Sequence, residues 1–301
     1  MSRSADPPGG WDPPDAAFQI LDGETRTCHW PSLLRTLYDR SCPWAAPLQP
    51  VHPPVPDPLA RLARVGADRP ALVVVGAAPE RQRPSTPDYD GLATRVVQES
   101  LVKRAVSLDV VRAGPSALAP EPPEGPLVVV GGPGSHRLSK AINQAFVRRA
   151  WGFWGFYFAP AGEARSRAGD LIRCWRLRAH ALPEEPGIPD PDDPYARLPD
   201  GRKEDVGILY AGANPLARQS WLVWVAGLGA VGTVGVALAL QEPRVVEAMA
   251  RGLTGGPTYA CALVRYRFAD EQRPLDGALA CMALTRGVLR PPSDVVGGLT
   301  R

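Results

Sequence analysis

The chain has few of the residues that build metal sites or disulfides, and it carries none of the common catalytic motifs. Four histidines and five cysteines occur among its 301 residues. The cysteines stand at positions 28, 42, 174, 261 and 281, and none forms a CxxC pair. A zinc site would have to use Cys28, His29 and Cys42, whose spacing is not one that zinc sites use. There is no Walker A, HExxH or Ser-His-Asp arrangement, so we expect no metal site and assign no reaction from motifs.

The N-terminus also lacks the apolar core of a signal peptide. Together with the unpaired cysteines, this predicts a cytoplasmic protein with reduced thiols. The net charge is only +3, which gives little attraction for a polyanion. Nucleic acid is therefore not an expected partner.

Proline, in contrast, is abundant, and its placement divides the chain. Of 35 prolines, 13 lie in the first 70 residues, and such segments bury too little apolar surface to fold alone. A second break, at 182–205, is rich in proline and acidic residues. The predicted segments are a disordered tail (1–16), a small N-terminal module with a strand, a turn and a helix at Trp30–Tyr38 (17–46), a Pro-rich linker (47–69), an α/β domain whose two halves meet at 182–205 (70–290), and a C-terminal tail (291–301).

The stretch from Ser220 to Leu240 contains no charged side chain. About 20 apolar residues can span a bilayer as one helix, so residues 220–240 have a membrane-helix interpretation. The alternative, which we favour, is a buried strand at Leu222–Val225, a glycine-rich turn and a buried helix over Thr233–Met249. Four closely spaced glycines lower helix propensity by about 1 kcal/mol each, and they do not form the GxxxG spacing of packed membrane helices.

Two further stretches repeat the order of strand, turn and helix. Leu127–Val130 is an apolar strand followed by Gly131–Ser135, in which Ser135 is placed to cap a helix. Val73–Val75 likewise ends at Gly76, and a helical pattern follows from Leu92 to about residue 105. Apolar strands that alternate with helices indicate βαβ crossovers. The expected fold is therefore α/β and Rossmann-like, with a mostly parallel sheet, helices on both faces and a Pro-rich N-terminal extension.

The glycine-rich turns predict where a ligand binds. Backbone N–H groups at a helix N-terminus favour an anion such as a phosphate, and glycine lets the ligand approach closely. Residues 227–232 match GxGxxG, but no acidic residue follows at the distance that a dinucleotide site requires. The alternative is that these glycines only let helix and strand pack closely. The candidate ligand-binding residues are Gly76, Gly131, Gly132, Gly134, Ser135, Gly227, Gly229, Gly232 and Thr233.

Arginines interleaved with aromatic residues occur in two stretches. Arg176 and Arg178 alternate with Trp175 and Leu177, and a second alternation places Arg265 and Arg267 among apolar residues. Such mixtures can bind single-stranded nucleic acid, but strict alternation is typical of a half-exposed strand, which is the interpretation we adopt. These arginines could also line a pocket for a phosphorylated ligand.

Three carboxylates are the weak catalytic candidates: Asp88 and Asp90 in the loop after the first strand, and Glu99 on the helix beyond. A carboxylate there could act on a ribose carbon, as in nucleotide glycosidases and base-exchange enzymes. The alternative is that Asp88 and Asp90 are solvated or cap the helix.

The order of these units resembles a poorly characterised group of prokaryotic Rossmann-like proteins. The resemblance is carried by strand–GGPGS–helix, by Asp205–Tyr210 with the Asn214-Pro215 turn, and by Gly227 and Gly232-Thr233, and it covers roughly residues 70–285. It implies a sensory or regulatory protein and supplies no catalytic residues. We therefore expect a protein that binds a nucleotide or other phosphorylated small molecule and signals to a protein partner through the N-terminal module; a homo-oligomer is compatible with this. The alternatives are the glycosidase or base-exchange enzyme and a scaffold without a ligand.

Overall fold

The computed structural model describes most of the region after residue 58 and one hairpin before it. The described residues are 18–21, 25–28, 58–64, 71–76, 88–102, 108–113, 126–165, 171–180, 195–251, 253 and 258–289. The predicted tails 1–16 and 291–301, the predicted helix Trp30–Tyr38 and the cysteine at position 42 lie outside these residues.

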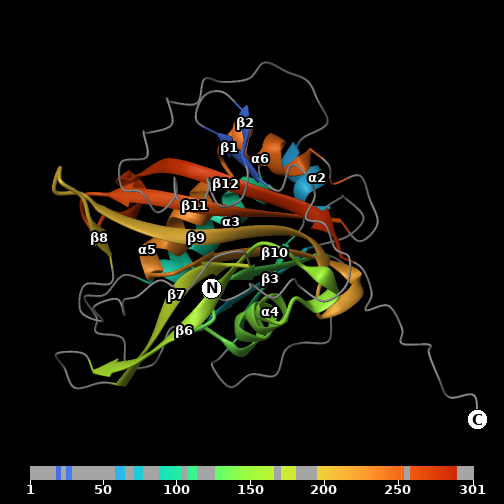
Figure 1. The fold of residues 1–301 in the computed structure, drawn as a ribbon, viewed down its shortest axis with the longest axis horizontal. Coiled ribbons are helices and arrows are strands. Elements are labelled where there is room, and N and C mark those ends of the chain that lie inside the picture. Colours follow the sequence, from blue (N-terminus) through green and yellow to red (C-terminus); the bar gives the residue numbers. More distant parts are fainter. Residues whose placement is uncertain are drawn as a thin grey trace, which may run out of the picture.

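The described strands form a ten-stranded mixed sheet and a separate hairpin (Figure 1). Nine strands run across the large sheet in the order β2 (Thr25–Cys28), β1 (Phe18–Leu21), β12 (Ala278–Val288), β11 (Thr258–Phe268), β9 (Lys203–Asn214), β10 (Ala217–Gly227), β5 (Leu127–Val130), β3 (Ala71–Gly76) and β4 (Leu108–Ala113). The short β8 (Ala196–Arg197) pairs with β9, and the hairpin consists of β6 (Phe156–Arg165) and β7 (Leu171–Ala179). The helices are α2 (Pro58–Ala63), α3 (Tyr89–Val102), α4 (Arg137–Val147), α5 (Ala230–Ala239) and α6 (Pro243–Ala250), with the 3₁₀ turns η1 (Ala150–Gly152) and η2 (Pro274–Asp276).

The prediction of a mostly parallel Rossmann-like sheet is wrong. Among the described strands of this sheet, only the pairs β10–β5, β5–β3 and β3–β4 are parallel, whereas β10–β9 and the pairs among β9, β11, β12, β1 and β2 are antiparallel. Two residues, Pro215 and Leu216, separate β9 from β10, and a connection this short can join only antiparallel neighbours. Apolar runs in the sequence show that both faces of a strand are buried, but they carry no information about strand direction.

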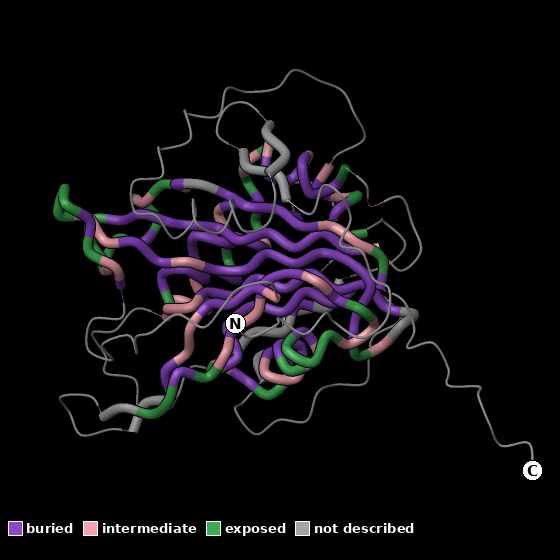
Figure 2. Tube along the Cα trace, in the orientation of Figure 1, coloured by how far each residue is buried: buried purple, intermediate pink, exposed green. Residues whose placement is uncertain are grey.

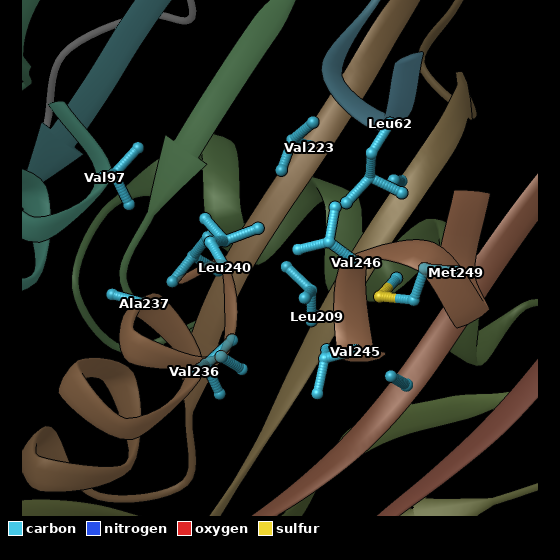
Figure 3. Close-up of a cluster of buried hydrophobic side chains, with 14 of the residues drawn as sticks. Leu62, Val97, Leu209, Val223, Val236, Ala237, Leu240, Val245, Val246 and Met249 are labelled. Atoms are coloured by element: carbon cyan, nitrogen blue, oxygen red, sulfur yellow. The ribbon is translucent and has the colours of Figure 1, made fainter. Parts of the chain in front are cut away.

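Both faces of the sheet are covered, by different elements. On one face, α2, α3, α5 and α6 pack on alternate residues of the central strands, including Val128. Figure 3 shows Leu209 and Val223 of the sheet among the side chains of these helices. On the other face, α4 and the β6–β7 hairpin pack on the intervening residues, including Val129 and Tyr210. Figure 1 shows these two layers on opposite sides of the sheet, and Figure 2 shows the buried strands between them. We call the first the α5 face and the second the α4 face.

The uncharged segment forms a strand, a turn and a helix, as the favoured interpretation predicts. It comprises the end of β10, a turn at Leu228 and Gly229, and α5. The predicted single helix Thr233–Met249 is in fact two, because α5 ends at Ala239 and α6 begins at Pro243, a residue that starts helices but disrupts their interior. Within the described residues, no helix has the length and apolar character needed to cross a membrane.

The N-terminal hairpin and part of the predicted linker join the main domain. β1 pairs with β12, so the hairpin of β1 and β2 extends the sheet. In α2, which lies within the predicted linker 47–69, Leu59 and Leu62 are buried. The indole nitrogen of Trp221 donates to the carbonyl of Leu62 at 2.8 Å, and the guanidinium of Arg64 lies 3.8 Å from the centre of a ring of Trp221. The packed domain therefore begins before residue 70.

Candidate functional site

The two predicted glycine turns lie side by side. They follow β5 and β10, which are adjacent parallel strands with Val130 opposite Val225. The backbone N–H of Gly131 donates to the carbonyl of Val225 at 2.9 Å. A Cβ on Gly132 would lie 2.8 Å from the carbonyl oxygen of Gly227, so glycine is required where the turns touch. The carboxyl edge of two neighbouring strands thus carries both turns.

The second turn, 227–233, is closed by a side chain of the protein itself. One carboxylate oxygen of Asp205 accepts from the backbone N–H of Gly232 at 2.6 Å, and the other accepts from that of Gly229 at 3.1 Å. The N–H of Gly227 donates to the hydroxyl of Thr233 at 3.1 Å. An external anion at this turn would have to displace Asp205. The geometry matches the alternative in which these glycines serve close packing, and ligand binding by Gly227, Gly229, Gly232 and Thr233 stays a prediction.

Asp205 reaches this turn because β9 is the antiparallel neighbour of β10. Gly207 stands opposite Gly227, so Asp205, two residues earlier, lies just beyond the end of β10. The helix N-terminus supplies positive potential that favours a carboxylate. The side chain is nevertheless buried, and burial raises its pKa to about 6, although the hydrogen bonds from Gly229, Val206 and Gly232 act in the opposite direction. This residue therefore acts as a built-in anion.

The first turn, 131–135, is held in place by hydrogen bonds from buried side chains. Gly131 has a φ of 117°, which glycine adopts readily. Its carbonyl accepts from the hydroxyl of Ser139 at 2.6 Å and from the indole nitrogen of Trp224 at 3.1 Å. The predicted cap, Ser135, is not the cap of α4: the ring of His136 accepts from the backbone N–H of Ser139 at 3.3 Å. Ser135 is consequently available for another role.

Ser135 donates its hydroxyl to Asp90, which stands in the first turn of α3. A Cβ on Gly131 would lie 3.1 Å from a carboxylate oxygen of Asp90, so Asp90 reaches directly to the first turn. Burial raises the pKa of Asp90 to about 6; the hydrogen bond from Ser135 opposes this shift, and the nearby charge of Asp88 adds to it. The carboxyl group can therefore gain or lose a proton near pH 6.

The other two candidate carboxylates have different positions. Asp88 accepts a hydrogen bond from the backbone N–H of Gly91 at 2.9 Å, which agrees with the alternative that it caps α3. Glu99 is exposed and lies nine residues beyond Asp90 on the same helix, about 13 Å away along the axis. Of the three, Asp90 alone meets a glycine turn.

Asp90 and the first turn occupy the switch point of the parallel strands. β3 and β5 are neighbours, but α3 packs on the α5 face and α4 on the α4 face. Open α/β sheets bind ligands where the helices after adjacent strands diverge in this way. Gly76 ends β3 beside this point, since Val75 stands opposite Val130. The structure thus gathers Gly76, Asp90 and Gly131–Ser135 at one edge.

Gly134 is the exposed residue of the first turn, and we call the surface at this residue the mouth of the turn. A Cβ here would lie 3.5 Å from the indole nitrogen of Trp175, an ordinary contact distance. Trp175 comes from β7, so the hairpin forms one wall beside the turn. The sequence pattern placed Trp175 on a strand face but gave no sign that it approaches the turn.

The prediction that Arg265 and Arg267 lie on a half-exposed strand is wrong. Both are buried, as are their apolar neighbours, because both faces of β11 are covered. They share the carboxylate of Glu204, at 2.5 Å from Arg265 and 2.8 Å from Arg267. Alternation along a strand shows which residues share a face, but it does not show that a face is open to solvent.

Comparison of the chain with protein-family models, with curated proteins and with solved structures found no match. The resemblance to Rossmann-like sensory proteins accordingly stays a prediction.

Proposed function

We propose that this protein binds a nucleotide or other phosphorylated small molecule at the first turn and passes the information to a protein partner. The observation that carries the proposal is the contact of Asp90 with Ser135 and Gly131 at the switch point. The N-terminus of α4 offers positive potential for a phosphate. The carboxyl group of Asp90 and the hydroxyl of Ser135 are suited to hydrogen bonds with sugar or base groups.

The ligand belongs at the first turn rather than the second, because Asp205 already occupies the donors of the second. Gly134 is exposed and Ser135 is only partly buried, so a ligand can reach the first turn from this side. The second turn then serves as a rigid wall, since Gly227 holds the backbone of Gly132 in close contact.

The N-terminal hairpin supports the proposed signalling role. β1 joins the sheet through β12, which is hydrogen-bonded to β11 and through it to β9. In the order of the described strands β2 stands at the end of the sheet, and edge strands are common sites for pairing with another chain. A partner at this edge would connect to the ligand site through hydrogen-bonded strands.

The test is a thermal-shift screen of nucleotides and phosphorylated metabolites on the full chain, followed by calorimetric titration of compounds that raise the melting temperature. We expect at least one such compound, and we expect Ser135→Ala and Asp90→Asn to weaken its binding by about tenfold, the loss of one hydrogen bond to a charged group. Glu99→Gln, which changes an exposed carboxylate on the same helix, is the control and should bind as the wild type does. A wild type that no compound stabilises would refute the proposal.

A second candidate function is the cleavage or exchange of a nucleotide glycosidic bond. The observation that favours it is the pKa of Asp90, which burial raises to about 6, within the range of a general acid. Chromatography of each stabilising nucleotide after incubation tests this directly. Release of a free base by the wild type, and its loss in Asp90→Asn while binding persists, would favour the enzyme; unchanged nucleotide would favour the regulatory function.

A further inference from the structure

A group of three buried charged residues lies on the α4 face beyond the first turn. Glu204 on β9 binds both Arg265 and Arg267 on β11. The side chains of Arg265, Arg267 and Glu204 are 10%, 7% and 3% exposed, respectively. Two guanidinium groups thus share one carboxylate in a site that excludes most water.

This group has more positive than negative charge. A buried charge is stable only when it is paired and its hydrogen-bonding atoms are satisfied. Arg267 has a further negative neighbour, because its charge contributes to lowering the pKa of Asp200. Within the described part of the chain, Arg265 forms an ion pair with Glu204, while its buried Nε atom has no hydrogen-bond partner. Arg265 is therefore the cation whose charge is least compensated.

Arg265 lies on the α4 face of the sheet, the face on which α4 follows the first turn. Arg265 stands opposite Val206 on β9. The carbonyl of Val206 accepts from the backbone N–H of Leu228 at 2.8 Å, and Leu228 directly follows Gly227, the residue that touches Gly132. Two strand spacings, about 10 Å, separate the backbone of Arg265 from the end of β10, and the first turn, which follows β5, lies one further spacing away. Val206 and Leu228, which lie between them, are only partly buried.

We propose that Arg265 is the second anion-binding residue of the ligand site, and that the ligand carries two or more linked phosphates. One phosphate lies at the first turn, and a second reaches the guanidinium of Arg265 across Val206 and Leu228. This inference rests on the proposed function for the contact at the first turn. It narrows the ligand class to nucleoside polyphosphates and related polyphosphates, since a single phosphate cannot reach both positions.

Arg265→Gln is the decisive variant. Removal of the Arg265 guanidinium leaves Glu204 and Arg267 as an ion pair of equal and opposite charge, so the fold should be retained. The control is Arg202→Gln: Arg202 lies near the start of β9 but is bound to the exposed Asp200 at 2.5 Å. The control removes the same charge without touching the proposed contact. Arg265→Lys keeps the positive charge but loses the planar guanidinium group, which can bind a phosphate at two points. It replaces Arg265→Gln as the test variant if the glutamine variant does not fold.

The experiment is calorimetric titration of the full chain with ATP, with AMP and with inorganic tripolyphosphate. We expect Arg265→Gln to weaken ATP and tripolyphosphate by about 10- to 100-fold, the loss of a charge-assisted contact, and to leave AMP unchanged. Arg202→Gln should change each affinity by less than about threefold. Arg265→Lys should weaken ATP at an unchanged melting temperature, because a lysine lacks the fork that binds a phosphate at two points.

The outcomes separate this inference from the proposed function. If nucleotides bind and Ser135→Ala weakens them, but Arg265→Gln binds ATP as the wild type does, the inference is overturned and the proposed function stands. If Arg265→Gln and Arg202→Gln weaken ATP equally, the effect is one of overall charge, and the inference is again overturned. If wild-type protein binds neither ATP nor tripolyphosphate, no polyphosphate site exists.

Discussion

The carboxylate of Asp205 lies against the N-terminus of α5, where one of its oxygens accepts a 2.6 Å hydrogen bond from the backbone N–H of Gly232. Backbone N–H groups of a turn with the GxGxxG pattern are thereby hydrogen-bonded to a side chain of the protein itself. The neighbouring turn, 131–135, also meets a carboxylate, but Asp90 is bound there by the side-chain hydroxyl of Ser135. Two turns of similar sequence therefore differ in what their surroundings leave for a ligand.

Removal of the Asp205 carboxylate should destabilise the fold. Asp205→Ala leaves the buried N–H of Gly232 and the part-buried N–H of Gly229 without their acceptor, and a buried unsatisfied group costs about 1–3 kcal/mol. We expect the free energy of unfolding in urea to fall by about 2–5 kcal/mol. Asp200→Ala, which removes an exposed carboxylate from the same region, is the control. A change below about 0.5 kcal/mol in Asp205→Ala would show that the hydrogen bonds contribute little.

Asp205 should also make stability depend on pH. Its pKa is raised by burial to about 6, above the value of about 3.9 for an unfolded aspartate. Between these values the folded state holds a proton that the unfolded state has released, so the free energy of unfolding falls as the pH rises from about 4 to 6. His180, whose pKa burial lowers to about 4, acts in the opposite direction.

The effect of Asp205 is therefore measured as a difference between wild type and Asp205→Asn, in urea unfolding at several pH values. As the pH rises from about 4 to 6, the free energy of unfolding of the wild type should fall relative to that of Asp205→Asn, by at most about 1.4 kcal/mol per pH unit. Above about pH 6 the difference between the two proteins should be constant. A difference that does not vary with pH would mean that the pKa of Asp205 is not raised.

The two glycines of the first turn should respond differently to alanine. A Cβ on Gly132 would lie 2.8 Å from a backbone oxygen, whereas a Cβ on Gly134 would have an ordinary contact at 3.5 Å with a side chain. We expect Gly132→Ala to lower the free energy of unfolding by about 1–3 kcal/mol and Gly134→Ala to change it by less than about 0.5 kcal/mol. Equal effects in thermal or urea unfolding would contradict the close contact between the turns.

Trp224 should hold the first turn in place. Its indole nitrogen donates to the carbonyl of Gly131 and, at 2.9 Å, to the hydroxyl of Ser139. Trp224→Phe keeps most of the apolar contact but removes this donor. We expect a loss of about 1–3 kcal/mol in stability together with weaker ligand binding. Trp221→Phe is the matched control, because Trp221 binds α2 on the opposite face of the sheet and should affect stability without a comparable effect on binding.

The sequence predicted the local units well, because each is encoded by neighbouring residues. The apolar strands before Gly76, Gly131 and Gly227 are present, and the turn at Asn214-Pro215 joins β9 to β10. Strand direction could not be predicted in the same way. Strands such as β10 are apolar on both faces because α5 and its neighbouring helices cover one side and α4 with the β6–β7 hairpin covers the other. Burial on both sides produces the same apolar pattern in parallel and antiparallel strands.

The sequence indicated some members of the candidate site, whose function stays a prediction. Asp90 and Gly131–Ser135 were candidates from local signals, and the structure places them together. Asp205 was missed because its contact with Gly232 depends on the register between β9 and β10, which no local pattern encodes. Glu204 was missed for the same reason, since an acidic residue at the start of a strand gives no sign of two buried arginines on the next strand.

We propose above all that a phosphorylated ligand binds at the first turn. The most direct test is calorimetric titration of three proteins with the nucleotide that most stabilises the wild type. The three proteins are the wild type, Gly134→Ala and Gly134→Asp. Gly134 is exposed, so both variants should fold with the stability of the wild type. We predict that Gly134→Ala binds within about threefold of the wild type, whereas the carboxylate of Gly134→Asp at the mouth of the turn repels the phosphate and weakens binding by at least about tenfold. Equal binding by all three proteins would place the ligand elsewhere and contradict the account.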